Sequence, residues 1–308
     1  MSDIDDARAE LAALHGLGKQ APTAAISRLG GLTNRVFRVD LPQQSLCLRL
    51  PGAGTEAYID RSDEAFAARA AADAGVSPEV VYSNSATGIM LTRFIDGATT
   101  MSPALFKSRT GAPARAAAAF RTLHNSGAQF ESRFELFAMI DDYLALLDGK
   151  PVALPEGYHA TVAEAETVRA ALAAHPLPIV ACHCDPLSEN FLDTGARMWI
   201  VDWEYSGMND PMWDLGDLSV EAEFDAAQDE ELITSYFGRT PTASERGRMV
   251  IYKAMCDLLW TLWGLIQLAN ENPADDFKAY AERRFARCRA LMATPGFAAH
   301  VRDVATGA

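Results

Sequence analysis

The most informative stretch of this sequence is Val180-Ala181-Cys182-His183-Cys184-Asp185-Pro186-Leu187-Ser188-Glu189-Asn190-Phe191-Leu192. Reduced to its polar skeleton, it is His-x-Asp-x-x-x-x-Asn. A short apolar run, Met198-Trp199-Ile200-Val201, follows it and ends at Asp202, with Gly195 in between. This order predicts a polar loop and then a hairpin whose second strand presents Asp202 beside the loop. A single aspartate in such a place is usually a capping residue, but the combined pattern indicates a functional site.

The residue types in this stretch suit phosphoryl transfer. That reaction needs a carboxylate near the attacking hydroxyl and metal ions on the phosphate oxygens. Asp185 can accept the hydroxyl proton, while Asn190 and Asp202 can offer the hard oxygen ligands that Mg²⁺ prefers. We therefore predict that Asp185, Asn190 and Asp202 are catalytic and that Asn190 and Asp202 are the metal ligands. His183 is expected to brace the loop through hydrogen bonds.

The stretch resembles the catalytic loop of the kinase-like phosphotransferases, which include aminoglycoside phosphotransferases and choline/ethanolamine kinases. The next segment, Ile200-Val201-Asp202-Trp203-Glu204-Tyr205-Ser206-Gly207-Met208-Asn209, is similar to the choline/ethanolamine kinase signature. Trp213-Asp214-Leu215-Gly216-Asp217 and Glu221 fit the same family. The resemblance extends from roughly Arg28 to Gln267. It implies an α+β, bilobal protein-kinase-like fold, with ATP and Mg²⁺ as cofactors and an alcohol as the phosphate acceptor.

The pattern of apolar residues divides the chain into two parts. Residues 1–97 contain short strand-like runs separated by turn residues, which predict a small antiparallel sheet carrying one helix, Arg61 to Ala74. Residues 98–308 predict a larger and mostly helical part, including a helix from Pro103 to Asn125. We predict a nucleotide-binding N-lobe at 1–97, a linker near Asp96 to Thr100, and a C-lobe at 98–308 with the catalytic loop and the acceptor-binding helices. The tail from Gly296 is expected to have little structure of its own.

Several residues of the first part are candidates for binding the nucleotide. Gly30-Gly31-Leu32-Thr33-Asn34 resembles the family's nucleotide loop, in which glycine lets backbone N–H groups approach phosphate, although a hairpin turn explains the two glycines as well. Arg49 stands where protein kinases carry a phosphate-contacting lysine, and the resemblance implies that Glu64 pairs with it. Outside this context, Glu64 would be an ordinary carboxylate in a first helical turn. Met90 to Ile95 resembles the hinge strand that binds adenine. The predicted cofactor-binding residues are Gly31, Thr33, Asn34, Arg49, Glu64, Thr92 and Phe94.

The candidate acceptor site is aromatic and acidic. A quaternary ammonium group cannot donate hydrogen bonds, so proteins hold it with aromatic faces and nearby carboxylates. Trp260 and Trp263 lie three residues apart and therefore on one helix face. Choline kinases have a similar pair, although such a pair is most often part of the core on pattern alone. The predicted substrate-binding residues are Asp185, Tyr205, Glu204, Glu221, Trp260 and Trp263.

An aromatic and acidic site favours choline as the acceptor. Ethanolamine, thiamine or an aminoglycoside are alternatives within the same enzyme class. A catalytically inactive kinase-like protein that only binds a ligand is the alternative from another class.

Bulk composition limits the partners. The formal net charge of -14 disfavours nucleic acid, which selects basic surfaces, and suits a cationic ligand. The five cysteines include no CxxC pair, so neither a zinc site nor a disulfide scaffold is indicated. The N-terminus lacks an apolar run, and no uncharged apolar stretch reaches the roughly 20 residues that span a bilayer. We predict a cytoplasmic monomer or homodimer that binds neither nucleic acid nor membrane.

Overall fold

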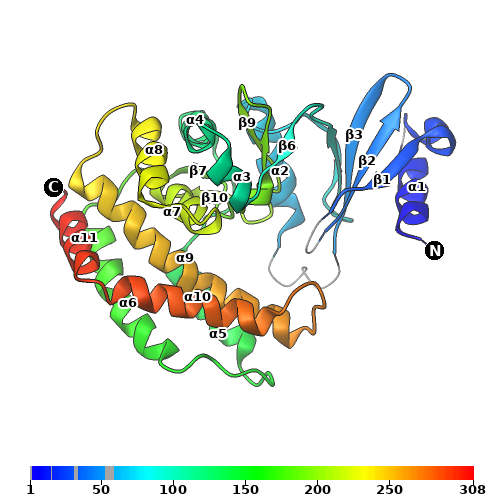
Figure 1. Ribbon diagram of the computed structural model, residues 1–308. Helices are drawn as coiled ribbons and strands as arrows, with labels where there is room; N and C mark the ends of the chain where they lie inside the picture. Colours follow the sequence, from blue (N-terminus) through cyan, green and yellow to red (C-terminus); the bar gives the residue numbers. More distant parts are fainter. Residues whose placement is uncertain (1, 15, 31–33, 53–58) are drawn as a thin grey trace.

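The computed structural model describes residues 2–14, 16–30, 34–52 and 59–308. Figure 1 shows a small sheet and the N-terminus at one end of the molecule and a group of helices with the C-terminus at the other. The short strands β7, β9 and β10 lie between them. The segment that carries the predicted catalytic residues is therefore central in the fold.

The N-terminal sheet is antiparallel and has five strands in the order β1-β2-β3-β5-β4. In β3, Leu46, Leu48 and Leu50 are buried, while Cys47 and Arg49 face the other side of the sheet because side chains alternate along a strand. Helix α1 packs on the leucine side. These elements are β1 (Ala25–Arg28), β2 (Arg35–Leu41), β3 (Gln44–Leu50), β4 (Val80–Asn84), β5 (Ile89–Arg93), α1 (Asp3–Ala13) and the 3₁₀ helix η1 (Gly18–Thr23).

Helix α2 (Arg61–Asp73) connects the sheet to the rest of the molecule. It begins at Asp60, whose side chain accepts hydrogen bonds from the two backbone N–H groups of Ser62 and Asp63. The alanines of its buried face, such as Ala67 and Ala71, belong to the core of the helical part rather than to the core of the sheet. The division into lobes at residue 97 remains a prediction. Helix α2 precedes this boundary in the sequence but packs on residues that follow it.

Five short strands carry the predicted catalytic segment. β8 (Phe191–Asp193) pairs antiparallel with β9 (Met198–Ile200), which confirms the predicted hairpin. β7 (Val180–Cys182) pairs with β10 (Gly207–Asn209), and β6 (Thr99–Thr100) pairs with β8. Because the hairpin is antiparallel, the start of β8 and the end of β9 lie side by side.

The remaining helices build the larger core around α9 (Ala243–Ala269), whose apolar residues are mostly buried. α9 is long and apolar enough to cross a membrane, but 83% of its most apolar window is buried inside the protein, so it is a core helix. The other helices are α3 (Pro103–Ser108), α4 (Ala112–His124), α5 (Leu136–Leu147), α6 (Tyr158–Ala174), the 3₁₀ helix η2 (Ser188–Asn190), α7 (Met212–Glu221), α8 (Ala226–Phe237), α10 (Phe277–Met292) and α11 (Pro295–Thr306).

Two predictions about the helices are wrong. The helix expected from Pro103 to Asn125 is broken into α3 and α4, because Gly111 adopts a left-handed conformation (φ 72°) at the start of α4. The tail from Gly296 is not unstructured: Thr294 caps the N-terminus of α11, and the buried Phe297 and Val304 attach that helix to the core. The strands β6 and β10 were also not expected, since runs of two or three residues carry no periodic signal.

Candidate active site

The loop between β7 and β8 is fixed by its own hydrogen bonds. His183 Nε2 lies 2.9 Å from Val201 O, and Asp185 N donates to His183 Nδ1 over 3.4 Å. Burial lowers the pKa of His183, so the neutral imidazole carries its proton on Nε2 and accepts at Nδ1. Asn190 Nδ2 donates to Asp185 O over 3.0 Å, which leaves the amide oxygen as its acceptor atom. His183 therefore holds the loop as predicted, and Asp185 and Asn190 lie together.

A second anchor of this loop comes from α7. The fully buried Asp214 accepts hydrogen bonds from the backbone N–H groups of His183 and Cys184, both over 2.8 Å. Its Oδ2 also lies 3.0 Å from His124 Nε2, and His124 Nδ1 lies 2.8 Å from the Tyr236 hydroxyl. Cys184 has a left-handed backbone (φ 67°), which is a strained conformation for a residue other than glycine. The hydrogen bond from its own N–H to Asp214 holds it in this conformation. The position of Asp185 is thus set by its two preceding residues.

The hairpin places Asp202 next to Asn190. Val201 N donates to Asn190 O over 3.0 Å, and Asp202 follows with a left-handed backbone (φ 69°). Its Oδ1 is buried and has no hydrogen-bond partner among the residues that the structure describes. Burial and the neighbouring Glu204 carboxylate raise the pKa of Asp202 to about 8. A buried carboxylate oxygen without a donor suits a cation, so Asp202 and Asn190 fit Mg²⁺ as oxygen ligands.

A group of ion pairs lies on the sheet side of Asp202. Arg49 pairs with Glu64 on α2, as the sequence predicts, and the Glu64 side chain is only 1% exposed. Arg49 Nη1 also lies 3.4 Å from Glu204 Oε1 and 3.6 Å from Asp202 Oδ1. Arg61 contacts both Glu64 and Glu204. This group joins β3, α2 and the segment after β9, and it directs a guanidinium group toward Asp202.

Glu204 belongs to this group. It accepts a hydrogen bond from Asn34 Nδ2 over 2.9 Å and contacts the two arginines, Arg49 and Arg61. The structure thus brings Glu204 together with the predicted nucleotide-binding residues Asn34, Arg49 and Glu64. Its predicted contact with the acceptor remains a prediction.

The other predicted nucleotide-binding residues are only partly described. Gly31 and Thr33 lie outside the described residues. Thr92 is paired with Cys47 across β5 and β3, and the Phe94 backbone N–H donates to Ser45 O over 3.0 Å. That N–H is therefore occupied, and an adenine contact at Phe94 would use its carbonyl group or ring.

Acidic residues of α7 lie near Asp185. Burial raises the pKa of Asp185 well above its ordinary value, and the carboxylates of Asp217 and Glu221 raise it further. Ser188 of the loop donates to Glu221 O over 3.3 Å, which ties this end of α7 to the loop. A cation bound here would compensate the negative charges.

The predicted aromatic residues lie close by in two groups. The ring centroids of Tyr205 and Trp260 are 5.2 Å apart, and Trp260 Nε1 donates to Asp217 Oδ2 over 3.4 Å. Trp263 instead contacts Phe277 and Tyr280 of α10, both with ring centroids 5.6 Å away. The two tryptophans share α9 but have different aromatic partners.

The sequence prediction missed three residues that the structure brings to the site. In the sequence, Asp214 and Asp217 stand out only through the family resemblance, and Arg284 does not stand out at all. One signal was available: Asp214, Asp217 and Glu221 are spaced i, i+3 and i+7, which places three acids on one face of the otherwise apolar α7. Arg284 gave no local signal, because its contacts with Glu221 and Asp257 join distant parts of the chain.

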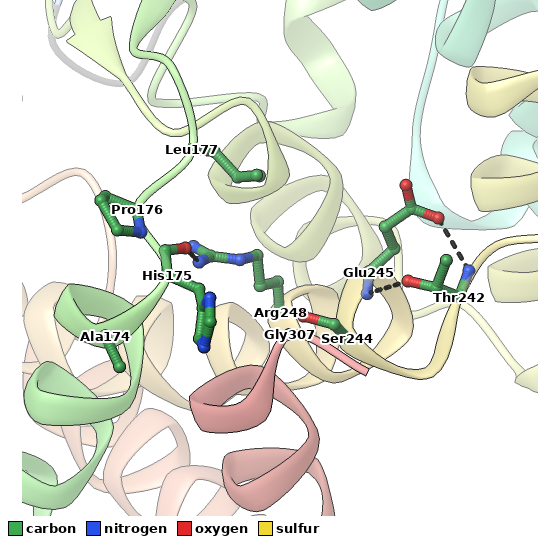
Figure 2. A pocket seen from close by; sticks show the side chains of 9 residues that line it. All are labelled: Ala174, His175, Pro176, Leu177, Thr242, Ser244, Glu245, Arg248 and Gly307. Atoms are coloured by element: carbon green, nitrogen blue, oxygen red, sulfur yellow. Dashed lines mark hydrogen bonds between the residues drawn. The ribbon is translucent and has the colours of Figure 1, made fainter.

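One cavity of about 400 Å³ lies at the far end of the helical part. Figure 2 shows the Arg248 side chain at this cavity, hydrogen-bonded to the His175 backbone, and Thr242 and Glu245 bonded to each other. Arg248 is also paired with Asp210. The cavity holds none of the predicted site residues, so it is distinct from the candidate active site; its lining is Ala174, His175, Pro176, Leu177, Thr242, Ser244, Glu245, Arg248 and Gly307.

Comparisons with known proteins extend over both parts of the molecule. A family model described as the phosphotransferase enzyme family (APH) matches residues 25–250. A choline/ethanolamine kinase family protein from Mesorhizobium loti is 66% identical, with a TM-score of 0.90 and coverage of 98% of this chain and 99% of its own. Choline kinase LicA from Streptococcus pneumoniae is 29% identical, with a TM-score of 0.74 and coverage of 87% and 93%. A structure of LicA in complex with AMP is 27% identical, with a TM-score of 0.73 and coverage of 87% and 91%.

Proposed function

This chain belongs to the phosphotransferase enzyme family, and from that premise we propose that it transfers the γ-phosphoryl group of ATP to the hydroxyl of choline. The family membership confirms the resemblance predicted from the catalytic segment, and with it the protein-kinase-like fold and a small alcohol as acceptor. The observation that carries the proposal is the position of Asp185. It accepts a hydrogen bond from Asn190 and is close enough to Asp202, Asp217 and Glu221 for their charges to raise its pKa.

The phosphates of ATP would lie between the sheet and the hairpin. Arg49 is held by Glu64 and reaches to 3.6 Å from Asp202 Oδ1, so its guanidinium group can bind phosphate next to the metal ligands. Asn190 and Asp202 would hold Mg²⁺, which supplies positive charge to the phosphate oxygens during transfer. The AMP bound in the LicA structure supports an adenine nucleotide as the donor.

Asp185 would act on the acceptor hydroxyl. As the hydroxyl oxygen forms its bond to the γ-phosphorus, the bond to the β-phosphate oxygen breaks and the hydroxyl proton moves to the Asp185 carboxylate. The raised pKa of Asp185 increases its affinity for that proton. The Asp185 backbone is held while this happens, because its N–H donates to His183 Nδ1 and its carbonyl accepts from Asn190 Nδ2. The products are ADP and the phosphorylated alcohol.

A cationic acceptor matches the surroundings of Asp185. Tyr205, Trp260 and Trp263 supply aromatic faces, and Asp217 supplies negative charge. An uncharged alcohol would leave this charge uncompensated. The two solved relatives named for choline or ethanolamine support an amino alcohol, and the aromatic faces favour the quaternary amine of choline over the ammonium of ethanolamine.

An acceptor panel tests this proposal. We expect ATP-dependent formation of phosphocholine, detected by mass spectrometry, with a higher kcat/KM for choline than for ethanolamine, thiamine or an aminoglycoside. Higher kcat/KM for any other acceptor would overturn choline as the substrate. No turnover with any of them would favour the inactive ligand-binding alternative.

Asp185→Ala provides the mechanistic test. Loss of the proton acceptor should lower kcat by about 10³-fold, within the range of general-base effects, while the affinity for ATP measured by calorimetry stays within about threefold. Glu189→Ala, at an exposed position of the same loop, is the matched control and should keep its activity. Turnover that survives in Asp185→Ala would contradict the role assigned to this residue.

We also propose that the enzyme works in the cytoplasm. The described cysteines, Cys47, Cys182, Cys184, Cys256 and Cys288, are all free thiols, which suits a reducing compartment.

A further inference from the structure

A buried arginine lies at the acidic end of the candidate acceptor site. Arg284 on α10 is 5% exposed and pairs with Glu221, and its Nη1 lies 3.3 Å from Asp257 Oδ1. Its guanidinium carbon lies 4.7 Å from the centre of the Tyr280 ring, one helical turn earlier. Arg284 thus contacts both an acid and an aromatic ring of the region proposed to hold the amine. Neither the sequence prediction nor the proposed mechanism uses it.

The charges around Arg284 can be counted from the contacts. Asp257 is already paired with Arg287, which makes two hydrogen bonds to it, each 2.6 Å long. Asp217 accepts hydrogen bonds only from uncharged donors among the described residues, Cys256 over 2.9 Å and Trp260 over 3.4 Å.

Two groups are set aside: the Asp257–Arg287 pair, and Asp214, which already accepts two backbone hydrogen bonds and lies 3.0 Å from His124 Nε2. Three carboxylates then remain near the site, those of Asp185, Asp217 and Glu221. Arg284 compensates one of them through its pair with Glu221. When these groups are ionised, as a bound cation favours, two negative charges are therefore left over. One belongs to Asp185, which must take the hydroxyl proton, and the other can balance a single ammonium group.

We propose that Arg284 determines specificity by limiting the acceptor to one positive charge. This inference rests on the proposed function, since it assigns the acidic and aromatic region to the amine. With Glu221 occupied by Arg284, a second ammonium group finds no carboxylate to pair with and meets a guanidinium group instead. Burying an unpaired charge is costly, so dicationic alcohols are excluded.

The test compares two amines of matched shape, 1-aminopropan-2-ol with one positive charge and 1,3-diaminopropan-2-ol with two. Their dissociation constants are measured by calorimetry at pH 7 in the presence of Mg²⁺ and a non-hydrolysable ATP analogue, so no turnover is required. Arg284→Gln should shift the ratio of the two constants toward the diamine by about tenfold, the effect of one added charge at several ångströms in a partly screened site. Glu221→Gln should shift the ratio the other way.

The double variant Arg284→Gln/Glu221→Gln separates charge from structure. It restores the count of two surplus charges without restoring the ion pair, so the ratio should return to within about threefold of the wild type. Arg284→Lys keeps the charge and should also keep the ratio. Arg289→Gln removes the same charge from the same helix, but its side chain is 41% exposed and pairs with Glu164 rather than with an acid near Arg284, so the ratio should stay within about twofold.

Two results would overturn the proposal: an unchanged ratio in Arg284→Gln, or an equal shift in Arg289→Gln. If Arg284→Gln does not fold, Glu221→Gln and the double variant decide, because a purely structural role predicts weaker binding of both amines with no change in their ratio. Failure of the proposed function is a different result. In that case the wild type binds neither these amines nor choline.

Discussion

At the scale of single residues, the site depends on which carboxylates already have donors. Glu204 receives contacts from Asn34, Arg49 and Arg61, whereas Asp202 Oδ1 receives no hydrogen bond among the described residues. The two acids are two positions apart and both lie near Arg49. Glu204 therefore stabilises the group of ion pairs, whereas Asp202 Oδ1 can bind a metal ion.

Glu64→Gln tests how this group directs Arg49. Without the Glu64 charge, Arg49 is expected to turn to Asp202, 3.6 Å from its Nη1, and to compete there with the metal ion. We expect the KM for ATP to rise about tenfold, which corresponds to ~1.4 kcal/mol, and the Mg²⁺ concentration for half-maximal rate to rise with it. Steady-state kinetics at varied ATP and Mg²⁺ measure both values.

The matched control is Glu79→Gln. Glu79 also pairs with an arginine of the sheet, Arg93, but its side chain is 67% exposed, so its loss should change neither constant. An unchanged Mg²⁺ requirement in Glu64→Gln would contradict the competition between Arg49 and the metal ion.

At the scale of elements, α7 is the part that joins the catalytic loop to the acceptor side. Asp214 holds the loop backbone, Asp217 meets Trp260 and Cys256 of α9, and Glu221 meets Arg284 of α10. These three acids lie on one face of a helix of ten residues. A single short helix therefore sets the distance between the reacting hydroxyl and the site proposed for the cation.

Asp214→Asn should weaken the hold on the loop. An asparagine offers one acceptor oxygen, so one of the buried N–H groups of His183 and Cys184 would face an NH₂ group. We expect a loss of about 2–3 kcal/mol in the free energy of unfolding, measured with urea, and a fall in kcat of more than about tenfold under conditions where the variant is folded.

Asp193→Asn is the control for this prediction, because Asp193 is equally buried but pairs with Arg109 and Arg115 away from the loop. It should lose stability and keep its kcat. Equal losses of kcat in the two variants would mean that Asp214 acts only through global stability.

Gly264 makes a second element-scale prediction, at the contact between α9 and α10. A Cβ atom at this position would lie 2.6 Å from Tyr280 Cδ1, so Gly264→Ala must displace the Tyr280 ring next to Trp263. We expect the KM for the acceptor to rise about fivefold, which corresponds to ~1 kcal/mol, while the KM for ATP stays unchanged.

Gly247→Ala is the matched substitution on the same helix. Its Cβ would lie 2.8 Å from His300 O on α11, far from the aromatic residues, so it should destabilise the fold by about 1–3 kcal/mol without changing either KM. An unchanged acceptor KM in Gly264→Ala would show that the position of the Tyr280 ring does not affect acceptor binding.

Structural elements that depend on neighbouring residues in the sequence were predictable. Alternating residues gave the strands of the sheet, and the spacing of His183, Asp185 and Asn190 gave the loop and hairpin. Contacts between distant segments were not predictable. Glu204 meets Arg49 across 155 positions, and Glu221 meets Arg284 through the packing of α7, α9 and α10. The separate partners of Trp260 and Trp263 likewise depend on where α10 lies.

At the scale of the whole molecule, the site collects negative charge inside a protein that is already acidic. Asp185, Asp202 and Asp217 all have raised pKa values, because Asp217 is buried and the other two are partly buried, and all three lie near other carboxylates. Such groups reduce the stability of the ligand-free protein at neutral pH, and the ligands that neutralise them restore it. The ligand-free enzyme is therefore less stable than it would be without these carboxyl groups, and this loss of stability favours binding of cations.

The dependence of stability on pH measures this cost. A carboxyl group with a raised pKa in the folded state holds its proton at pH values where the unfolded chain has lost it, so stability falls as pH rises toward the folded pKa. The buried His183 has a lowered pKa and acts in the opposite sense only below about pH 6.5, and buried thiols contribute near their ordinary pKa of about 8.5. The pKa of Asp202, about 8, sets the window: between about pH 7 and 8 the carboxyl groups dominate. The free energy of unfolding should fall there by at most about 1.4 kcal/mol per pH unit for each proton held.

Asp217→Asn removes one of these protons and keeps an acceptor oxygen for Cys256 or Trp260. We expect urea denaturation in the presence of EDTA, without nucleotide, to show a flatter pH dependence than in the wild type. At pH 8 the variant should melt about 2 °C or more above the wild type, the shift that ~1 kcal/mol gives in a chain of this size. Asp229→Asn, at a partly exposed acid paired with Lys253, should leave the slope unchanged. A slope in Asp217→Asn equal to that of the wild type would mean that Asp217 holds no extra proton in the folded state, and the charge attributed to the empty site would then have to be carried by Asp185 and Asp202.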